Sequence, residues 1–144
     1  MKKCSDVMTK DVVTGTSQTT IVEAARLMKS EDIGPLLIVD NEQSRTLVGI
    51  ITDRDIVVKA IADGKDPKTT PVGEVMSKKL VTCRADDDVD VAMKAMAQFQ
   101  LRRIPVVEEN MMLVGIISQA DVATRVDAPE KTGEVVKEIS EETA

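Results

Sequence analysis

The sequence contains no histidine, tryptophan or tyrosine, and Phe99 is its single aromatic residue. Histidine is the commonest general base and metal ligand, so its absence weakens a hydrolase or zinc-enzyme interpretation. Without aromatic side chains there is no stacking platform of the kind that binds single-stranded nucleic acid. These absences argue against an enzyme and against a nucleic-acid-binding protein.

Cysteine and long apolar runs are also scarce. Cys4 and Cys83 fit neither a metal-binding nor a redox spacing, so we expect reduced thiols. No apolar run approaches the ~20 residues that span a bilayer, and the first residues lack the apolar region of a secretory signal. The formal net charge of −6 opposes binding to a nucleic-acid backbone. We therefore expect a cytoplasmic protein with no membrane or nucleic-acid partner, and the sequence identifies no metal-binding residues.

An internal repeat organises what is present. "SDVMTKDVVT" (residues 5–14) matches "GEVMSKKLVT" (residues 73–82), with an offset of 68 residues from Met8 to Met76. Further along, "VGIITDRD" (residues 48–55) matches "VGIISQAD" (residues 114–121). The offset is 68 residues at the first match and 66 at the second, and such a nearly constant offset indicates a duplicated structural unit.

Each copy predicts the same order of elements, β-α-β-β-α. Thr20 and Glu23 form a capping box before an amphipathic helix, and the acids of residues 86–88 begin its counterpart. The expected strands are residues 12–14, 36–39, 47–51, 80–82, 104–107 and 113–117, and the expected second helices are residues 53–62 and the segment from Gln119.

We predict an α+β fold, in which two β-α-β-β-α repeats pack with pseudo-twofold symmetry. A unit of roughly 55 residues buries too little surface for comfortable stability alone, so the two should pack on each other and leave clefts between them. The predicted boundaries are residues 5–62 and 73–128 for the domains, 63–72 for a linker rich in turn formers, and 129–144 for an acidic tail.

These repeats resemble a pair of CBS domains, also called a Bateman module. The resemblance rests on the "V-M-[TS]" openings, the strand "RRIPVV" and the "G-I-I-[ST]-x-x-D" endings, and it covers about residues 5–126. Within the family the chain is most similar to short stand-alone bacterial proteins of the stress- or hypoxia-response type. The resemblance implies a regulatory, non-catalytic module that binds an adenine nucleotide between the repeats, and a homodimer formed through helices.

The motif of a hydroxyl three residues before an acid has two interpretations. Thr52 with Asp55, and Ser118 with Asp121, can simply cap the helices that follow them. The same geometry also suits a nucleotide, since helix-start N–H groups attract phosphate and a carboxylate accepts from two ribose hydroxyls. The family resemblance implies the second role, with the acid at the ribose and the hydroxyl near the phosphate.

Arg102 and Arg103 also have two interpretations. They can be solvated charges before a buried strand, or they can clamp a phosphate with their planar guanidinium groups. The first repeat has Gly34 and Pro35 at the matching positions, so two identical sites are not expected. We expect the arginines to act with Thr52 and Asp55 of the opposite repeat.

The resemblance places a base pocket at the ends of the first strands. The segments of residues 14–16 and 82–84 are implied to line it, with Ile104 and Pro105 as an apolar wall; ordinary strand-to-loop structure is the alternative. The complete set of predicted nucleotide-binding residues is Thr14, Thr52, Asp55, Thr82, Cys83, Arg102, Arg103, Ile104, Pro105, Ser118 and Asp121.

The leading hypothesis is thus a sensor that binds AMP, ADP or ATP as a regulatory ligand. S-adenosylmethionine, NAD, a divalent metal or no ligand at all stay open. The alternative is a dimeric interaction module of a stress response, whose partner is an effector protein and whose function does not depend on a ligand. An enzyme is opposed by the missing histidine and by the absence of the G-x-x-x-x-G-K-[ST] phosphate loop.

Overall fold

A computed structural model describes residues 2–125, which form two compact units. Unit 2 is the continuous segment Val13–Leu80, whereas unit 1 combines the residues up to Val12 with those from Val81 onward. The predicted acidic tail of residues 129–144 lies outside the described residues.

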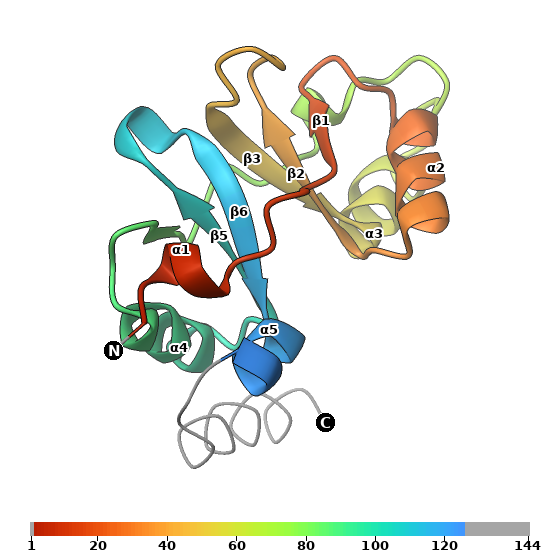
Figure 1. The fold of residues 1–144 in the computed structure, drawn as a ribbon. Coiled ribbons are helices and arrows are strands. Elements are labelled where there is room, and N and C mark those ends of the chain that lie inside the picture. The colour runs from red at the N-terminus through yellow and green to blue at the C-terminus, as the bar shows by residue number, and fades with distance from the viewer. Residues whose placement is uncertain (1, 126–144) are drawn as a thin grey trace. The chain divides into compact units, whose positions relative to one another are not determined.

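Unit 2 is a three-stranded sheet with its helices on one face (Figure 1). Strand β1 (Thr14–Thr16) runs parallel to the central strand β2 (Pro35–Val39), and β3 (Leu47–Thr52) pairs antiparallel with β2. The other elements are α2 (Ile21–Glu31), α3 (Asp53–Asp55), which continues as the π-type helix η1 (Ile56–Ile61), and the short turn η2 (Val72–Glu74).

Unit 1 repeats this sheet with the same strand directions. Strand β4 (Cys83–Arg84) is parallel to β5 (Arg103–Val107), and β6 (Leu113–Ser118) is antiparallel to β5. The remaining elements are α1 (Cys4–Val7), α4 (Val89–Gln98), the turn η3 (Glu109–Met111) and α5 (Gln119–Arg125). The α+β class predicted from the repeat is confirmed.

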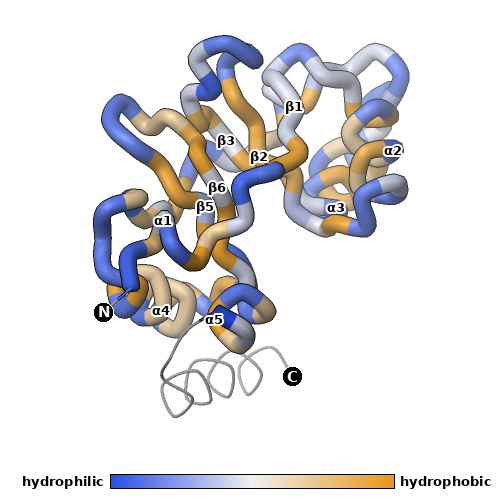
Figure 2. Tube along the Cα trace, in the orientation of Figure 1, coloured by the Kyte–Doolittle hydropathy of each residue, from blue (hydrophilic) through white to orange (hydrophobic). Residues whose placement is uncertain are grey.

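The hydrophobic pattern of the sequence explains each sheet. In β3 and β6 buried and half-buried residues alternate strictly, as expected when one sheet face packs against helices. Figure 2 shows the resulting hydrophobic stretches along β2, β3, β5 and β6, separated by hydrophilic turns. Each unit has its own core, centred on Ile38 and Ile51 in unit 2 and on Ile104 and Ile117 in unit 1.

The two V-M-[TS] segments, here called openers, pack on the sheets in a way that the repeat did not reveal. The first opener (residues 7–9) lies along the free edge of β6, where Thr9 and Ile116 exchange backbone hydrogen bonds of 2.8 and 3.0 Å. The second opener (residues 75–77) does the same at β3, through Ser77 and Ile50. Each opener therefore covers the last strand of the other sequence repeat.

The glycine of each "V-G-I-I" strand provides room for the opener. A Cβ atom on Gly115 would lie 2.5 Å from the Sδ of Met8, and one on Gly49 would lie 2.6 Å from the Sδ of Met76. Only a residue without a side chain allows this approach.

The predicted helices and the four long strands are confirmed, but some local details differ. The first strands were expected at residues 12–14 and 80–82, and they lie two to three residues later, as β1 and β4. The helices α1 and η2 were not predicted, because each is a single short turn without amphipathic periodicity. In the part of the chain that is described, no helix has the length and apolar character needed to cross a membrane.

Candidate functional site

The junction between β6 and α5 is a fully satisfied capping box. The Asp121 backbone N–H donates to the Ser118 hydroxyl at 3.2 Å, and the Ser118 N–H donates to Asp121 Oδ2 at 3.0 Å. The Ser118 hydroxyl itself donates to Asp121 Oδ2 at 3.1 Å. This geometry starts the helix, as the capping interpretation of the motif predicted.

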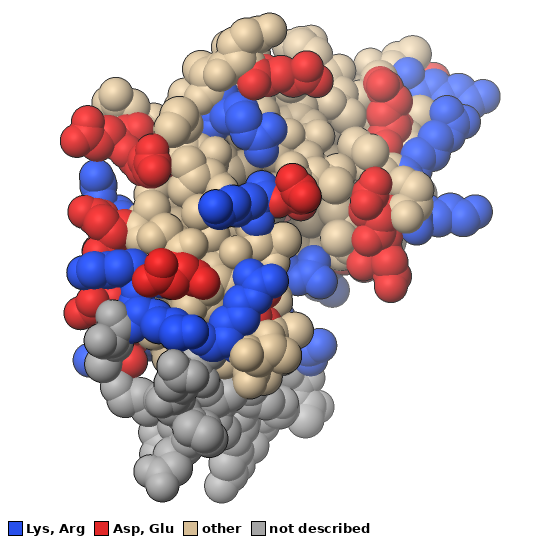
Figure 3. All heavy atoms as spheres, viewed as in Figure 1, with Lys and Arg blue, Asp and Glu red and all other residues tan. Residues whose placement is uncertain are grey.

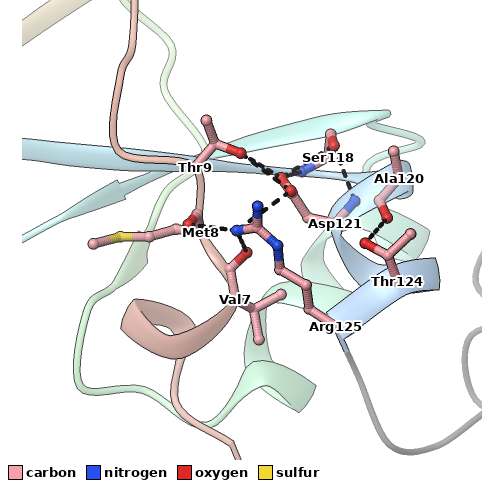
Figure 4. Close-up of polar contacts among 8 residues, drawn as sticks. All are labelled: Val7, Met8, Thr9, Ser118, Ala120, Asp121, Thr124 and Arg125. Atoms are coloured by element: carbon pink, nitrogen blue, oxygen red, sulfur yellow. Dashed lines mark hydrogen bonds and ion pairs between the residues drawn. The ribbon is translucent and has the colours of Figure 1, made fainter.

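Two residues outside the motif complete this junction (Figure 4). The Thr9 hydroxyl donates to Asp121 Oδ1 at 3.1 Å, and Arg125 lies 3.8 Å from the same oxygen. Arg125 also donates to the backbone carbonyls of Val7 and Met8, each at 3.0 Å. Asp121 is only 7% exposed, and protein groups use most of the acceptor capacity of its carboxylate. Its bond from Thr9 holds the first opener in place.

The junction between β3 and α3 has the same capping box and fewer additional contacts. The Thr52 N–H donates to Asp55 Oδ2 at 3.0 Å, and the Asp55 N–H donates to the Thr52 hydroxyl oxygen at 3.1 Å. Lys59 forms an ion pair of 3.3 Å with Asp55 Oδ1. The hydroxyl of Ser77, at the position that matches Thr9, accepts from the Lys79 N–H instead.

The two junctions therefore differ in what they can still bind. A carboxylate offers about four lone-pair sites. Asp121 accepts hydrogen bonds from Ser118 and Thr9 and forms an ion pair with Arg125, whereas Asp55 accepts from the Thr52 N–H and faces only a half-exposed lysine. The Asp55 junction keeps the greater capacity to accept hydrogen bonds from a ligand.

Gln119 introduces a further polar group that the sequence did not single out. Its Nε2 is buried and has no hydrogen-bond partner among residues 2–125. A buried amide without a partner costs free energy, so a ligand acceptor beside Ser118 would relieve that cost. In the sequence, Gln119 could have been noticed because it directly follows Ser118, at the position where the first repeat has the exposed Asp53.

The arginine pair lies at the same end of its sheet as Ser118. Arg103 is the register partner of Ser118 across β5 and β6, and the carbonyl of Arg102 accepts from the Gln119 N–H at 3.1 Å. Both arginine side chains are exposed. In unit 2 the matching register pair is Pro35 and Thr52, which has no cation. The joint action of the arginines with Thr52 and Asp55 stays a prediction.

The residues of the predicted base pocket have mixed exposure. Thr14 and Thr82 are half-buried, whereas Ile104 and Pro105 are buried in β5. Cys83 is 2% exposed, and its thiol donates to the Pro105 carbonyl at 3.8 Å within the core of unit 1. A contact between Cys83 and a ligand would therefore fall on its backbone.

A pocket of about 360 Å³ opens at the other end of the unit 1 sheet. It lies near the end of β5, where Glu108, Glu109 and Asp86 outnumber the single cation Arg84. The acidic lining of this pocket disfavours a phosphate group. Of the residues predicted to line the base pocket, only Arg84 lines this one.

The distribution of charged side chains and of possible metal ligands also bears on what the described residues can bind. Figure 3 shows acidic and basic side chains interspersed over the visible face, without a large area of one sign. Among the described residues, no group of three or more cysteine, aspartate or glutamate side chains is placed to hold a metal ion.

Comparisons with known proteins place these features in a family. The model of the CBS domain matches residues 4–61 and 72–128. The CBS domain-containing protein YhcV of Bacillus subtilis is 39% identical over 140 residues, which is 97% of this chain and 96% of that protein. Hypoxic response protein 1 of Mycobacterium tuberculosis is 36% identical over 123 residues, covering 85% of this chain and 84% of that protein.

Two solved structures are similar in fold and sequence. A crystal structure of hypoxic response protein 1 with two coordinated zinc ions has a TM-score of 0.76 and 35% identity, and the match covers 87% of this chain and 99% of that one. The CBS domain pair of protein MJ0100, in complex with 5′-methylthioadenosine and S-adenosyl-L-methionine, has a TM-score of 0.70 and 32% identity, with coverage of 85% and 94%.

Proposed function

Since this chain belongs to the CBS-domain family and consists of a tandem pair, we propose that it is a regulatory module that binds an adenine nucleotide. AMP, ADP and ATP are the proposed ligands, and the module acts through a change in shape or assembly rather than through catalysis. The related MJ0100 pair binds two adenosine compounds, which supports an adenosine-bearing ligand.

The observation that carries the proposal is the spare capacity of the Thr52–Asp55 junction. Asp55 has a side chain 17% exposed, and one of its oxygens faces only Lys59. Two neighbouring ribose hydroxyls are donors that a single carboxylate can accept together. The Thr52 hydroxyl accepts within the capping box and can donate its own hydrogen to a phosphate oxygen.

Arg102 and Arg103 are the proposed phosphate ligands. Guanidinium groups form paired, charge-assisted hydrogen bonds with phosphate oxygens. Adenosine alone should therefore bind more weakly than its phosphates, and the variants Arg102→Gln and Arg103→Gln should remove most of this difference.

Isothermal titration calorimetry of nucleotide-free protein tests the proposal. AMP, ADP and ATP are titrated separately, with GTP and S-adenosyl-L-methionine as comparisons. We expect saturable heat with at least one adenine nucleotide and a weaker or absent response with GTP. Folded protein that gives no response to millimolar adenine nucleotide would refute the proposal.

A second candidate function is a ligand-independent interaction module. The Thr9–Asp121 contact favours it, because this carboxylate already has a structural role. In that case an effector protein would be captured equally well with and without nucleotide, and Asp55→Ala would leave the capture unchanged.

We also propose that the module is a homodimer. Val57, Val58 and Ile61 lie within about one turn of η1 and are 59%, 46% and 52% exposed. Apolar surface gathered in this way is typical of a contact with another protein. Light scattering after size-exclusion chromatography should give twice the chain mass for the wild type and a smaller mass for Val57→Asp with Ile61→Asp. A monomeric wild type would contradict the proposal.

A further inference from the structure

The two cysteines of the sequence meet in the core of unit 1. Cys4 begins α1 and Cys83 begins β4, so they are far apart along the chain. Both belong to the same hydrophobic cluster, with exposures of 0% and 2%. Each thiol acts on the pKa of the other, and both thiols are free.

The backbone holds the two cysteines in this position. The N–H of Cys4 donates to the Asp87 carbonyl at 2.8 Å, and the N–H of Ser5 donates to the Ala85 carbonyl at 3.0 Å. These bonds fix the start of α1 against the loop that follows β4. Each thiol also has a weak backbone acceptor. The Cys4 thiol lies 3.8 Å from the Asp88 carbonyl oxygen, and the Cys83 thiol lies 3.8 Å from that of Pro105.

The two thiols are not equivalent. The neighbouring Cys83 thiol lowers the pKa of Cys4, against the opposing effects of burial and of Asp87. The same contact, together with burial, raises the pKa of Cys83. Cys4 also lies on a helix of four residues that can open locally, whereas Cys83 belongs to a sheet. Cys4 therefore has the character of an attacking thiol, and Cys83 that of a resolving thiol.

We propose that Cys4 and Cys83 are a redox modification site, at which a hydroperoxide converts the pair into a disulfide that fastens α1 to β4. The Cys4 thiolate attacks the peroxide, the O–O bond breaks, and Cys4 becomes a sulfenic acid while hydroxide leaves. The Cys83 sulfur then forms the S–S bond, and the sulfenic oxygen leaves as water. With hydrogen peroxide, the two thiols lose two hydrogens in total and two waters are produced.

A disulfide between Cys4 and Cys83 would affect the first opener, because the pair lies at the start of the segment that leads into it. The first opener begins at Val7, the last residue of α1; it covers the edge of β6, and its Thr9 donates to Asp121. A disulfide at Cys4 would restrict the opening of this segment and so stabilise unit 1.

Oxidation of the folded, full-length protein with hydrogen peroxide tests the proposal. Intact mass spectrometry should show the loss of two hydrogens, and a non-reducing digest should contain the Cys4 peptide linked to the Cys83 peptide. A dithiol reductant should reverse both changes. The thermal midpoint of the oxidised wild type should rise by several degrees.

Cys4→Ser and Cys83→Ser are the matched controls. Cys83→Ser should retain a sulfenic or sulfinic Cys4, with added oxygen in place of lost hydrogen, and neither variant should gain thermal stability on oxidation. A peroxide concentration that links the two cysteines in urea is applied to the folded wild type. The proposal is overturned if the folded protein keeps two free thiols, or if it forms only sulfinic acids or disulfides between chains.

Discussion

At the scale of single residues, the hydroxyl of the opener makes a different contact at each of the two strand-to-helix junctions. Thr9 donates to the buried carboxylate of Asp121, while Ser77, at the matching position, accepts from a nearby backbone N–H. This difference makes the Asp121 junction a structural contact and leaves the Asp55 junction with spare acceptor capacity.

Replacing Thr9 by valine should destabilise the protein by about 1 to 2 kcal/mol. The substitution keeps the shape of the side chain but removes a hydrogen bond to a charged, buried acceptor. Urea unfolding measures the change, with Ser77→Ala as the control. Equal losses for the two variants would show that the Thr9 bond has no special role.

At the scale of elements, the contact between each opener and its strand depends on glycine. A Cβ on Gly115 would lie 2.9 Å from the Thr9 carbonyl oxygen as well as close to the Met8 sulfur, so the opener could not keep its place. A Cβ on Gly34 would meet nothing closer than 3.8 Å, at the Asp53 carboxylate.

Gly115→Ala should therefore cost about 1 to 3 kcal/mol through overpacking, and Gly34→Ala less than about 0.5 kcal/mol. Hydrogen exchange adds a local readout, since the Ile116 amide should lose protection in Gly115→Ala and the Ile50 amide should keep it. If Gly115→Ala is as stable as Gly34→Ala, the described packing of the opener is wrong.

The capping box of α2 predicts a pH dependence. The hydrogen bond from the Thr20 hydroxyl, at 2.8 Å, lowers the pKa of Glu23 below its ordinary value of 4.5. Because the folded pKa is lowered, the stabilisation is fully present above pH 4.5 and is lost as the pH falls through the folded pKa.

Glu23→Ala should therefore be less stable than the wild type at neutral pH, and the gap should narrow in acid. Thermal unfolding from neutral to acidic pH measures this gap. In a Thr20→Val background the effect of Glu23→Ala should vary less with pH. A gap that stays constant below pH 4.5 would contradict this role of the carboxylate.

The sequence predicted those elements whose information is local. The capping box at Thr20, the alternation in residues 47–51 and the periodicity of the helices identified α2, α4, β3 and β6, because neighbouring residues determine such structure. Both capping boxes of the candidate site were also predicted from their spacing.

The partners of the openers could not be predicted in this way. Each opener and each "V-G-I-I" strand occurs twice, so the pattern does not say whether Met8 packs on Gly49 or on Gly115. The Thr9–Asp121 bond, the role of Arg125 and the meeting of Cys4 with Cys83 all depend on that choice. They are contacts over more than 70 residues of chain, for which no local signal exists.

At the scale of the whole molecule, the chain passes from unit 1 to unit 2 after Val12 and returns after Leu80. The two units share one fold, and their junctions differ in how many hydrogen bonds the carboxylate already accepts. In the proposed function, the free acceptor capacity of Asp55 and the structural contacts of Asp121 favour the Asp55 junction for the ribose.

The most direct test compares the affinities of Asp55→Asn and Asp121→Asn for AMP, ADP and ATP by calorimetry, with circular dichroism to establish that each is folded. We predict that Asp55→Asn weakens the binding of the preferred nucleotide by roughly 10- to 100-fold, at nearly unchanged stability. Asp121→Asn should mainly lower stability and change the affinity much less. Wild-type affinity in folded Asp55→Asn, together with loss of binding in folded Asp121→Asn, would contradict the account.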